Sequence, residues 1–134
     1  MNEVVKFLEE NPVQYIATAG LDGNPKVRPF MFMLEAGEKL YFCTSNQKPV
    51  YKQVKNNPYI EITTASPEFA WIRLSGKVVF SDDIKIKKAI IEKSEIVKSQ
   101  YQTADNPIFE IFYLDEAKAT IADFSGEPPK EYTL

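Results

Sequence analysis

Histidine is absent from this sequence of 134 residues. It is the most common general base near neutral pH, a usual zinc ligand and the usual axial ligand of haem. Its absence argues against histidine-based catalysis and against haem ligation. The adjacent carboxylates Asp82 and Asp83 fit a helix cap better than an acid–base pair. We therefore expect no metal site.

Cysteine is also scarce, since Cys43 is the only one. A single cysteine cannot form a disulfide within the chain, and this usage is typical of a reducing cytoplasm. Cys43 lies in an apolar segment, so we interpret it as a buried, unreactive thiol. No apolar run is long enough to span a membrane, and the first residues show no signal-peptide pattern. We therefore expect a cytoplasmic protein without a membrane partner.

Positive charge is not in excess, because 16 lysines and arginines face 19 aspartates and glutamates, giving a net charge of −3. Nucleic-acid binding depends largely on basic contacts with phosphate groups. We therefore expect no nucleic-acid partner. A barrel that stacks single-stranded nucleic acid on its aromatic residues remains the least favoured interpretation.

The hydrophobic pattern predicts short strands interrupted by a few helices. Helices are predicted over 3–10, with Asn2 as its cap, between Ser45 or Asn46 and Asn57-Pro58, and from Asp83 to about Gln100. The predicted strands are 14–19, 26–34, 39–44, 59–65, 69–80, 108–114 and 117–123. The strand over 69–80 should bend or bulge at Gly76.

Seven strands with short turns and peripheral helices are typical of a mainly β protein. The order favours a small antiparallel β-barrel, of either Greek-key or split type. The length suits one domain that covers residues 1–134.

Two basic clusters are candidate binding residues. Lys26 and Arg28 form the first cluster. Arg28 precedes Pro29, which has no N–H to donate to a neighbouring strand and so predicts an edge or a bulge in the strand over 26–34. Ser45, Lys48 and Lys52 lie around a predicted helix start, where free N–H groups favour anions. Each cluster alone is more simply explained as solvated surface charge. When the two clusters are considered together, a phosphate site and solvated surface charge explain them equally well.

Aromatic residues give a weaker indication of a ligand site. Most of them lie on predicted strands and must form the core. Trp71 and Arg73 are two residues apart and so lie on the same face of their strand. There they could face a flat ligand instead of the core.

Three segments in their order resemble the pyridoxamine 5'-phosphate oxidase-like family of FMN-binding split barrels. The first is Gly23-Asn24-Pro25-Lys26-Val27-Arg28-Pro29-Phe30, which is similar to the family's G-x-P-x-x-R-P strand. The second is Tyr41-Phe42-Cys43-Thr44, followed by Lys48 and by residues 53–58. The third is Trp71-Ile72-Arg73-Leu74-Ser75-Gly76-Lys77-Val78. The resemblance covers nearly the whole chain.

The resemblance implies a homodimer with two FMN sites at the subunit interface. The cofactor-binding residues that it implies are Arg28, Lys48, Lys52, Trp71, Arg73, Pro29, Phe30, Met31, Thr44 and Ser45. Arg28 and Lys48 would hold the FMN phosphate, assisted by Lys52. Trp71 and Arg73 would flank the flavin from the other subunit. The remaining five would line the ring and the ribityl chain.

The chain departs from true vitamin B6 oxidases, which carry an Arg-x-His motif near the C-terminus. Because histidine is absent, we expect that this protein is not a pyridoxamine phosphate oxidase. The resemblance implies an FMN-dependent oxidoreductase that transfers a hydride at flavin N5 to or from an unidentified small molecule. The alternatives are a non-catalytic flavin-binding or sensor protein and an F420-dependent reductase of the same fold.

Overall fold

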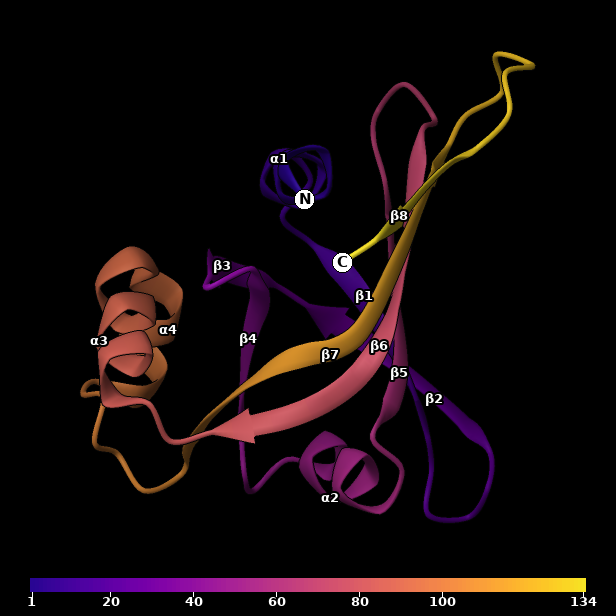
Figure 1. The fold of residues 1–134 in the computed structure, drawn as a ribbon. Helices are drawn as coiled ribbons and strands as arrows, with labels where there is room; N and C mark the ends of the chain where they lie inside the picture. The colour runs from indigo at the N-terminus through magenta and orange to yellow at the C-terminus, as the bar shows by residue number, and fades with distance from the viewer.

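The computed structural model describes residues 1–134 as four helices and an eight-stranded sheet (Figure 1). In chain order the elements are α1 (Asn2–Glu10), β1 (Gln14–Ala19), β2 (Pro25–Phe30), β3 (Phe32–Ala36), β4 (Lys39–Ser45), α2 (Pro49–Asn56), β5 (Tyr59–Ala65), β6 (Trp71–Ser81), α3 (Ile84–Lys93), α4 (Glu95–Tyr101), β7 (Phe109–Ala122) and β8 (Lys130–Thr133). None of the helices has the length and apolar character needed to cross a membrane.

The strand order is β2-β1-β5-β6-β7-β4-β3, and β8 pairs with β7. Every neighbouring pair is antiparallel. The two strands at the ends of this path, β2 and β3, are consecutive in the chain and only Met31 separates them. No ladder joins β2 to β3, so the sheet curves into a barrel that stays open along one seam. The predicted mainly β split barrel is confirmed.

The expected irregularities occur where glycine and proline predict them. The register of β6 on β7 shifts between Ser75 and Lys77, so the predicted bulge at Gly76 is confirmed. A Cβ atom at Gly76 would lie 3.0 Å from the Leu114 Cβ, which explains why the close strand approach requires glycine. Pro29 lies in β2, which is an edge strand as predicted, but the break in the stretch over 26–34 comes at Met31.

Four predicted boundaries are wrong. The expected helix ending near Gln100 is two helices, because Ser94 ends α3 and its hydroxyl accepts a hydrogen bond from the Val97 N–H to cap α4. The expected last two strands are one continuous strand, β7, and β8 follows it in the tail. The caps of the first two helices are also wrong, since Met1 and Lys48 occupy those positions and neither makes a side-chain cap.

The hydrophobic core has two parts. The larger part fills the barrel, where Val4 and Leu8 of α1 and Val50 and Val54 of α2 close its open ends. The smaller part lies between α3, α4 and strands β3, β4 and β7. Figure 1 shows α3 and α4 as a pair on one side of the sheet, apart from α1 and α2. A site near the start of α2 therefore lies between the barrel and the α3–α4 pair.

Candidate functional site

A cavity of about 370 Å³ lies beside the open seam, between the β2–β3 junction, β4, the start of α2 and α4. This volume falls in the range of about 300–1,000 Å³ that is usual for small-molecule sites. Nine of its 13 lining residues are hydrophobic. Its only charged lining residues are Arg28 and Lys48, and both are cations.

Arg28 is presented to this cavity by the edge strand β2. Its Nη1 donates to the Ile16 carbonyl at 3.3 Å and to the Thr18 hydroxyl at 2.7 Å, and its Nη2 donates to Gln53 Oε1 at 2.6 Å. Burial lowers the pKa of the Arg28 guanidinium, but an arginine stays protonated because its ordinary pKa is so high. Arg28 is therefore a half-buried cation whose protein partners are all neutral.

Lys48 is the residue that precedes the first turn of α2, and Pro49 occupies the first helical position. Its side chain is exposed. The two residues expected to cap this helix instead fix the corner that leads to it. The Ser45 hydroxyl accepts from the Gln47 N–H at 3.1 Å, and the Asn46 amide donates to the Pro107 carbonyl at 2.9 Å.

Neither cation of the cavity has an acidic partner. The four ion pairs of the structure join other residues and lie at the surface. Charge without a nearby counter-charge attracts an anionic group, and an arginine beside a lysine suits phosphate particularly well. The cavity can therefore hold an anionic group near its cations and an apolar group along its remaining wall.

The apolar wall carries two groups that could titrate, Cys43 and Tyr101. Burial raises the pKa of the Cys43 thiol to about 12, and the Lys48 charge opposes this rise more weakly. Burial, followed by the effect of Cys43, raises the pKa of Tyr101 to about 12. Both groups are protonated at pH 7, so neither is placed to act as a general base there. Cys43 is only partly buried, in contrast to the buried thiol expected, because it lines the cavity.

Tyr101 belongs to the part of the site that sequence reasoning missed. Ile96, Val97, Gln100 and Tyr101 of α4 line the cavity opposite the cations. Tyr101 is held in place by Phe109, whose ring centroid lies 4.8 Å away. The signal that a new helix begins here is Ser94 followed by Glu95, a common pair of residues at a helix start.

The structure brings five of the ten predicted cofactor residues to the cavity. These are Arg28, Pro29, Phe30, Met31 and Lys48.

The other five predicted residues do not line this cavity. Thr44 and Ser45 are buried in β4, and the Thr44 hydroxyl has no hydrogen-bond partner. Lys52 is exposed on α2. Trp71 is the first residue of β6 and packs on Phe124, with 5.0 Å between ring centroids.

Arg73 lies on β6, and the strand registers relate it to the cavity. It pairs with Thr63, which pairs with Tyr15, which pairs with Pro29. Arg73 and Pro29 are therefore in one cross-strand row, three strands apart, which corresponds to about 14 Å. Within one chain, Arg73 is too far from the cavity rim to line it.

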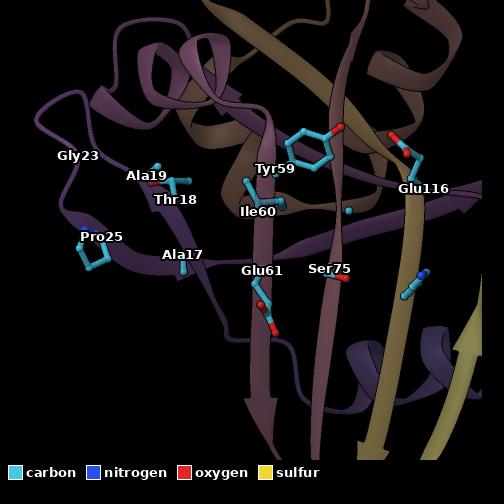
Figure 2. A pocket seen from close by; sticks show the side chains of 12 residues that line it. Ala17, Thr18, Ala19, Gly23, Pro25, Tyr59, Ile60, Glu61, Ser75 and Glu116 are labelled. Carbon is cyan, nitrogen blue, oxygen red and sulfur yellow. The ribbon is translucent and has the colours of Figure 1, made fainter.

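A second, broader hollow of about 640 Å³ lies over the outer surface of β1, β5 and β6 (Figure 2). Its charged residues have both signs, namely Glu61, Glu116 and Lys118. Figure 2 shows its side chains spread over several neighbouring strands, with Glu61 and Glu116 well separated. Two carboxylates against one amine disfavour a phosphate ligand there.

A family model described as pyridoxamine 5'-phosphate oxidase matches residues 1–119. A NimC/NimA family protein from Clostridium acetobutylicum, known from its crystal structure, is 34% identical to this chain with a TM-score of 0.92. That match covers 100% of this chain and 92% of the other chain.

Two more distant structures share the fold. One is a pyridoxamine 5'-phosphate oxidase-related FMN-binding protein from Nostoc punctiforme, at 17% identity and a TM-score of 0.75, covering 97% of this chain and 86% of that one. The other is an F420 reductase, at 23% identity and a TM-score of 0.63, covering 81% of this chain and 89% of that one. A search of curated proteins found no match.

Proposed function

Because the chain belongs to the pyridoxamine 5'-phosphate oxidase-like split-barrel family, we propose that it is an FMN-dependent oxidoreductase. The proposed reaction is hydride transfer to or from a small molecule. The observation that supports it is the pairing of Arg28 and Lys48, without any carboxylate, beside an otherwise apolar cavity. FMN has the matching chemistry, because it joins a phosphate to a flat, largely apolar ring.

The residues present fit this group. A guanidinium has five N–H donors, and Arg28 uses three of them within the chain, leaving two for a phosphate. Lys48 adds a second, flexible cation, and Lys52 follows it by one helical turn. The backbone from Pro29 to Met31 would support the ring. The side chains of Thr44 and Ser45 are both buried, so only their backbone, in the corner before α2, would approach the ribityl chain.

The bound flavin would supply hydride transfer at N5. The chain would orient it, exclude water along the apolar wall and leave proton delivery to solvent. Cys43 and Tyr101 remain protonated near neutral pH, since burial raises the pKa of each to about 12. A site without a general base suits hydride transfer better than hydrolysis.

The proposed assembly is a homodimer of single-domain chains (residues 1–134) in the cytoplasm. The outer face of β1, β2 and β5 exposes Tyr15, Val27 and Tyr59, with 45%, 68% and 59% of their surfaces accessible. Such a patch suits a subunit interface. Trp71 and Arg73 of the partner subunit would then complete the flavin site, because neither reaches the cavity within its own chain.

The test combines a titration with a reduction assay. FMN added to the purified protein should quench tryptophan fluorescence at a stoichiometry of one per chain. The loaded protein, mixed anaerobically with NADH, NADPH or reduced F420, should then lose its flavin absorbance. Absence of FMN binding would overturn the proposal. Binding without reduction by any donor would favour a non-catalytic flavin protein, and reduction by F420 alone would favour an F420-dependent enzyme.

A further inference from the structure

The guanidinium of Arg28 is held by a closed set of three hydrogen bonds with Thr18 and Gln53. Arg28 donates to the Thr18 hydroxyl at 2.7 Å and to Gln53 Oε1 at 2.6 Å. The Thr18 hydroxyl donates in turn to the same Gln53 Oε1 at 2.6 Å. Each residue therefore contacts the other two, and the set joins β1, β2 and α2.

Thr18 and Gln53 are both buried, with only 4% and 8% of their surfaces exposed. Buried polar side chains are costly unless their hydrogen bonds are satisfied. Two donors converge on Gln53 Oε1. The guanidinium fixes which way the amide points, because the opposite orientation would place the Nε2 donor against a group that can only donate. The amide is thus an oriented acceptor rather than a group that merely fills space.

The neutrality of these acceptors matters for the charge of the site. Arginine in a partly buried position usually pairs with a carboxylate, which cancels most of its charge. Here the acceptors are a hydroxyl, an amide oxygen and the Ile16 carbonyl. They hold the side chain in place and leave its positive charge uncompensated.

The same contacts also fix the separation of the two cations. Lys48 directly precedes α2, and Gln53 lies on the buried side of that helix. By binding Arg28, Gln53 ties the helix that carries Lys48 to the strand that carries Arg28. A shift of α2 that moved Lys48 away would therefore break the contacts of Gln53 with Thr18 and Arg28.

We propose that Gln53 and Thr18 are positioning residues that hold Arg28 as an uncompensated cation for a phosphate group. This inference rests on the proposed function for the identity of the phosphate compound. The assignment of Gln53 and Thr18 to an anion site is independent of flavin chemistry.

The decisive variant is Gln53→Glu, which keeps the shape and the acceptor but adds a negative charge beside Arg28. It can fold, because Arg28 would gain an ionic partner in the same geometry. Gln102→Glu is the matched control, since it makes the same change at an exposed position after α4. A second pair is Thr18→Val, which removes the hydroxyl, and Thr18→Ser, which keeps it.

Two probes separate anion binding from flavin binding. Inorganic phosphate should raise the melting temperature of the wild type and of Gln102→Glu by several degrees, and that of Gln53→Glu much less. The dissociation constant for FMN should rise about 10- to 100-fold in Gln53→Glu, as expected for losing a charge-assisted contact. The constant for riboflavin, which lacks the phosphate, should stay within about twofold of wild type. Thr18→Val should weaken FMN binding, and Thr18→Ser should restore it.

Each result decides the inference. Selective loss of phosphate and FMN binding in Gln53→Glu supports it, whereas equal loss of FMN and riboflavin would show a purely structural role. Wild-type phosphate stabilisation in Gln53→Glu, or none in the wild type, would overturn it. A further outcome is that phosphate raises the melting temperature of the wild type but not that of Gln53→Glu, while FMN binds neither protein. In that case the inference stands and the flavin proposal fails.

Discussion

The outer hollow over β1, β5 and β6 and the smaller cavity beside the seam differ in the charge of their linings. The outer hollow is larger, at about 640 Å³ against about 370 Å³, but its Glu61 and Glu116 outnumber its one lysine. The smaller cavity has two cations and no carboxylate. A phosphate ligand would lose its hydration in either place, and only the smaller cavity offers a net positive charge in return. Volume alone would therefore favour the outer hollow, whereas charge favours the smaller cavity.

Removing Arg28, the more buried cation of the smaller cavity, should give the largest difference in FMN affinity between substitutions in the two hollows. We expect Arg28→Ala to raise the dissociation constant for FMN about 30- to 1,000-fold, because its lost contacts are directional and partly desolvated. Lys118→Ala, in the outer hollow, should leave FMN affinity unchanged. Isothermal titration calorimetry of both variants measures the contrast. A loss of similar size in Lys118→Ala would move the site to the outer face.

Reversing the exposed cation should have a smaller effect. We expect Lys48→Glu to weaken FMN binding about 10- to 100-fold through repulsion of the phosphate, with most of the loss removed by high salt because Lys48 is exposed. Fluorescence titrations in low and high salt measure it. Lys118→Glu is the control for added negative charge. Equal FMN affinity of wild type and Lys48→Glu in low salt would exclude Lys48 from the site.

A substitution in the outer hollow should affect stability instead of binding. We expect Gly76→Ala to lower the free energy of unfolding by about 1–3 kcal/mol, because its Cβ would lie 3.0 Å from the Leu114 Cβ and 3.2 Å from the Asp115 carbonyl oxygen. Urea unfolding measures the change, and FMN titration of the folded variant should give the wild-type constant. A variant as stable as wild type would show that β6 and β7 can separate there at little cost.

The smaller cavity should also give the protein an alkaline sensitivity. The pKa of Cys43 rises from 9.0 to about 12 on folding, so the unfolded state loses its proton first. The stability from this neutral thiol is present below about pH 9 and is lost as the pH rises towards 12. Between pH 8 and pH 10.5 we expect wild type to lose about 1–2 kcal/mol more than Cys43→Ala in urea unfolding. Parallel losses would contradict the raised pKa.

Sequence reasoning located most strands because the barrel follows simple alternation. In β5 buried and exposed residues alternate without exception, and its predicted limits, Tyr59 and Ala65, are those observed. The division between α3 and α4 was not predicted, because the helical spacing of apolar residues continues across Ser94, where α3 ends. The strand β8 was missed because the tail from Phe124 to Leu134 has no strong strand pattern. Its pairing with β7 and contacts such as the Tyr132 hydroxyl donating to Glu3 hold it in place.

The site was predictable to the extent that it depends on local sequence. Arg28 and Lys48 stand out beside a proline and a helix start, and the fold brings both to one cavity. Gln53 and Tyr101 gave no such signal. Gln53 resembles any polar helix residue until the fold places it 2.6 Å from an arginine 25 positions earlier. Contacts across such distances in sequence depend on strand order, which the local pattern does not determine.

The single-residue link at Met31 gives the barrel one direction of easy deformation. Spreading any other pair of neighbouring strands breaks a row of backbone hydrogen bonds, but β2 and β3 share none. Rotation about the backbone of Met31 can therefore widen the seam at little enthalpic cost. Met31 also lines the cavity. The molecule is thus most compliant at the Met31 wall of the cavity, while the hydrogen bonds of Arg28 to β1 and α2 hold that cation in place.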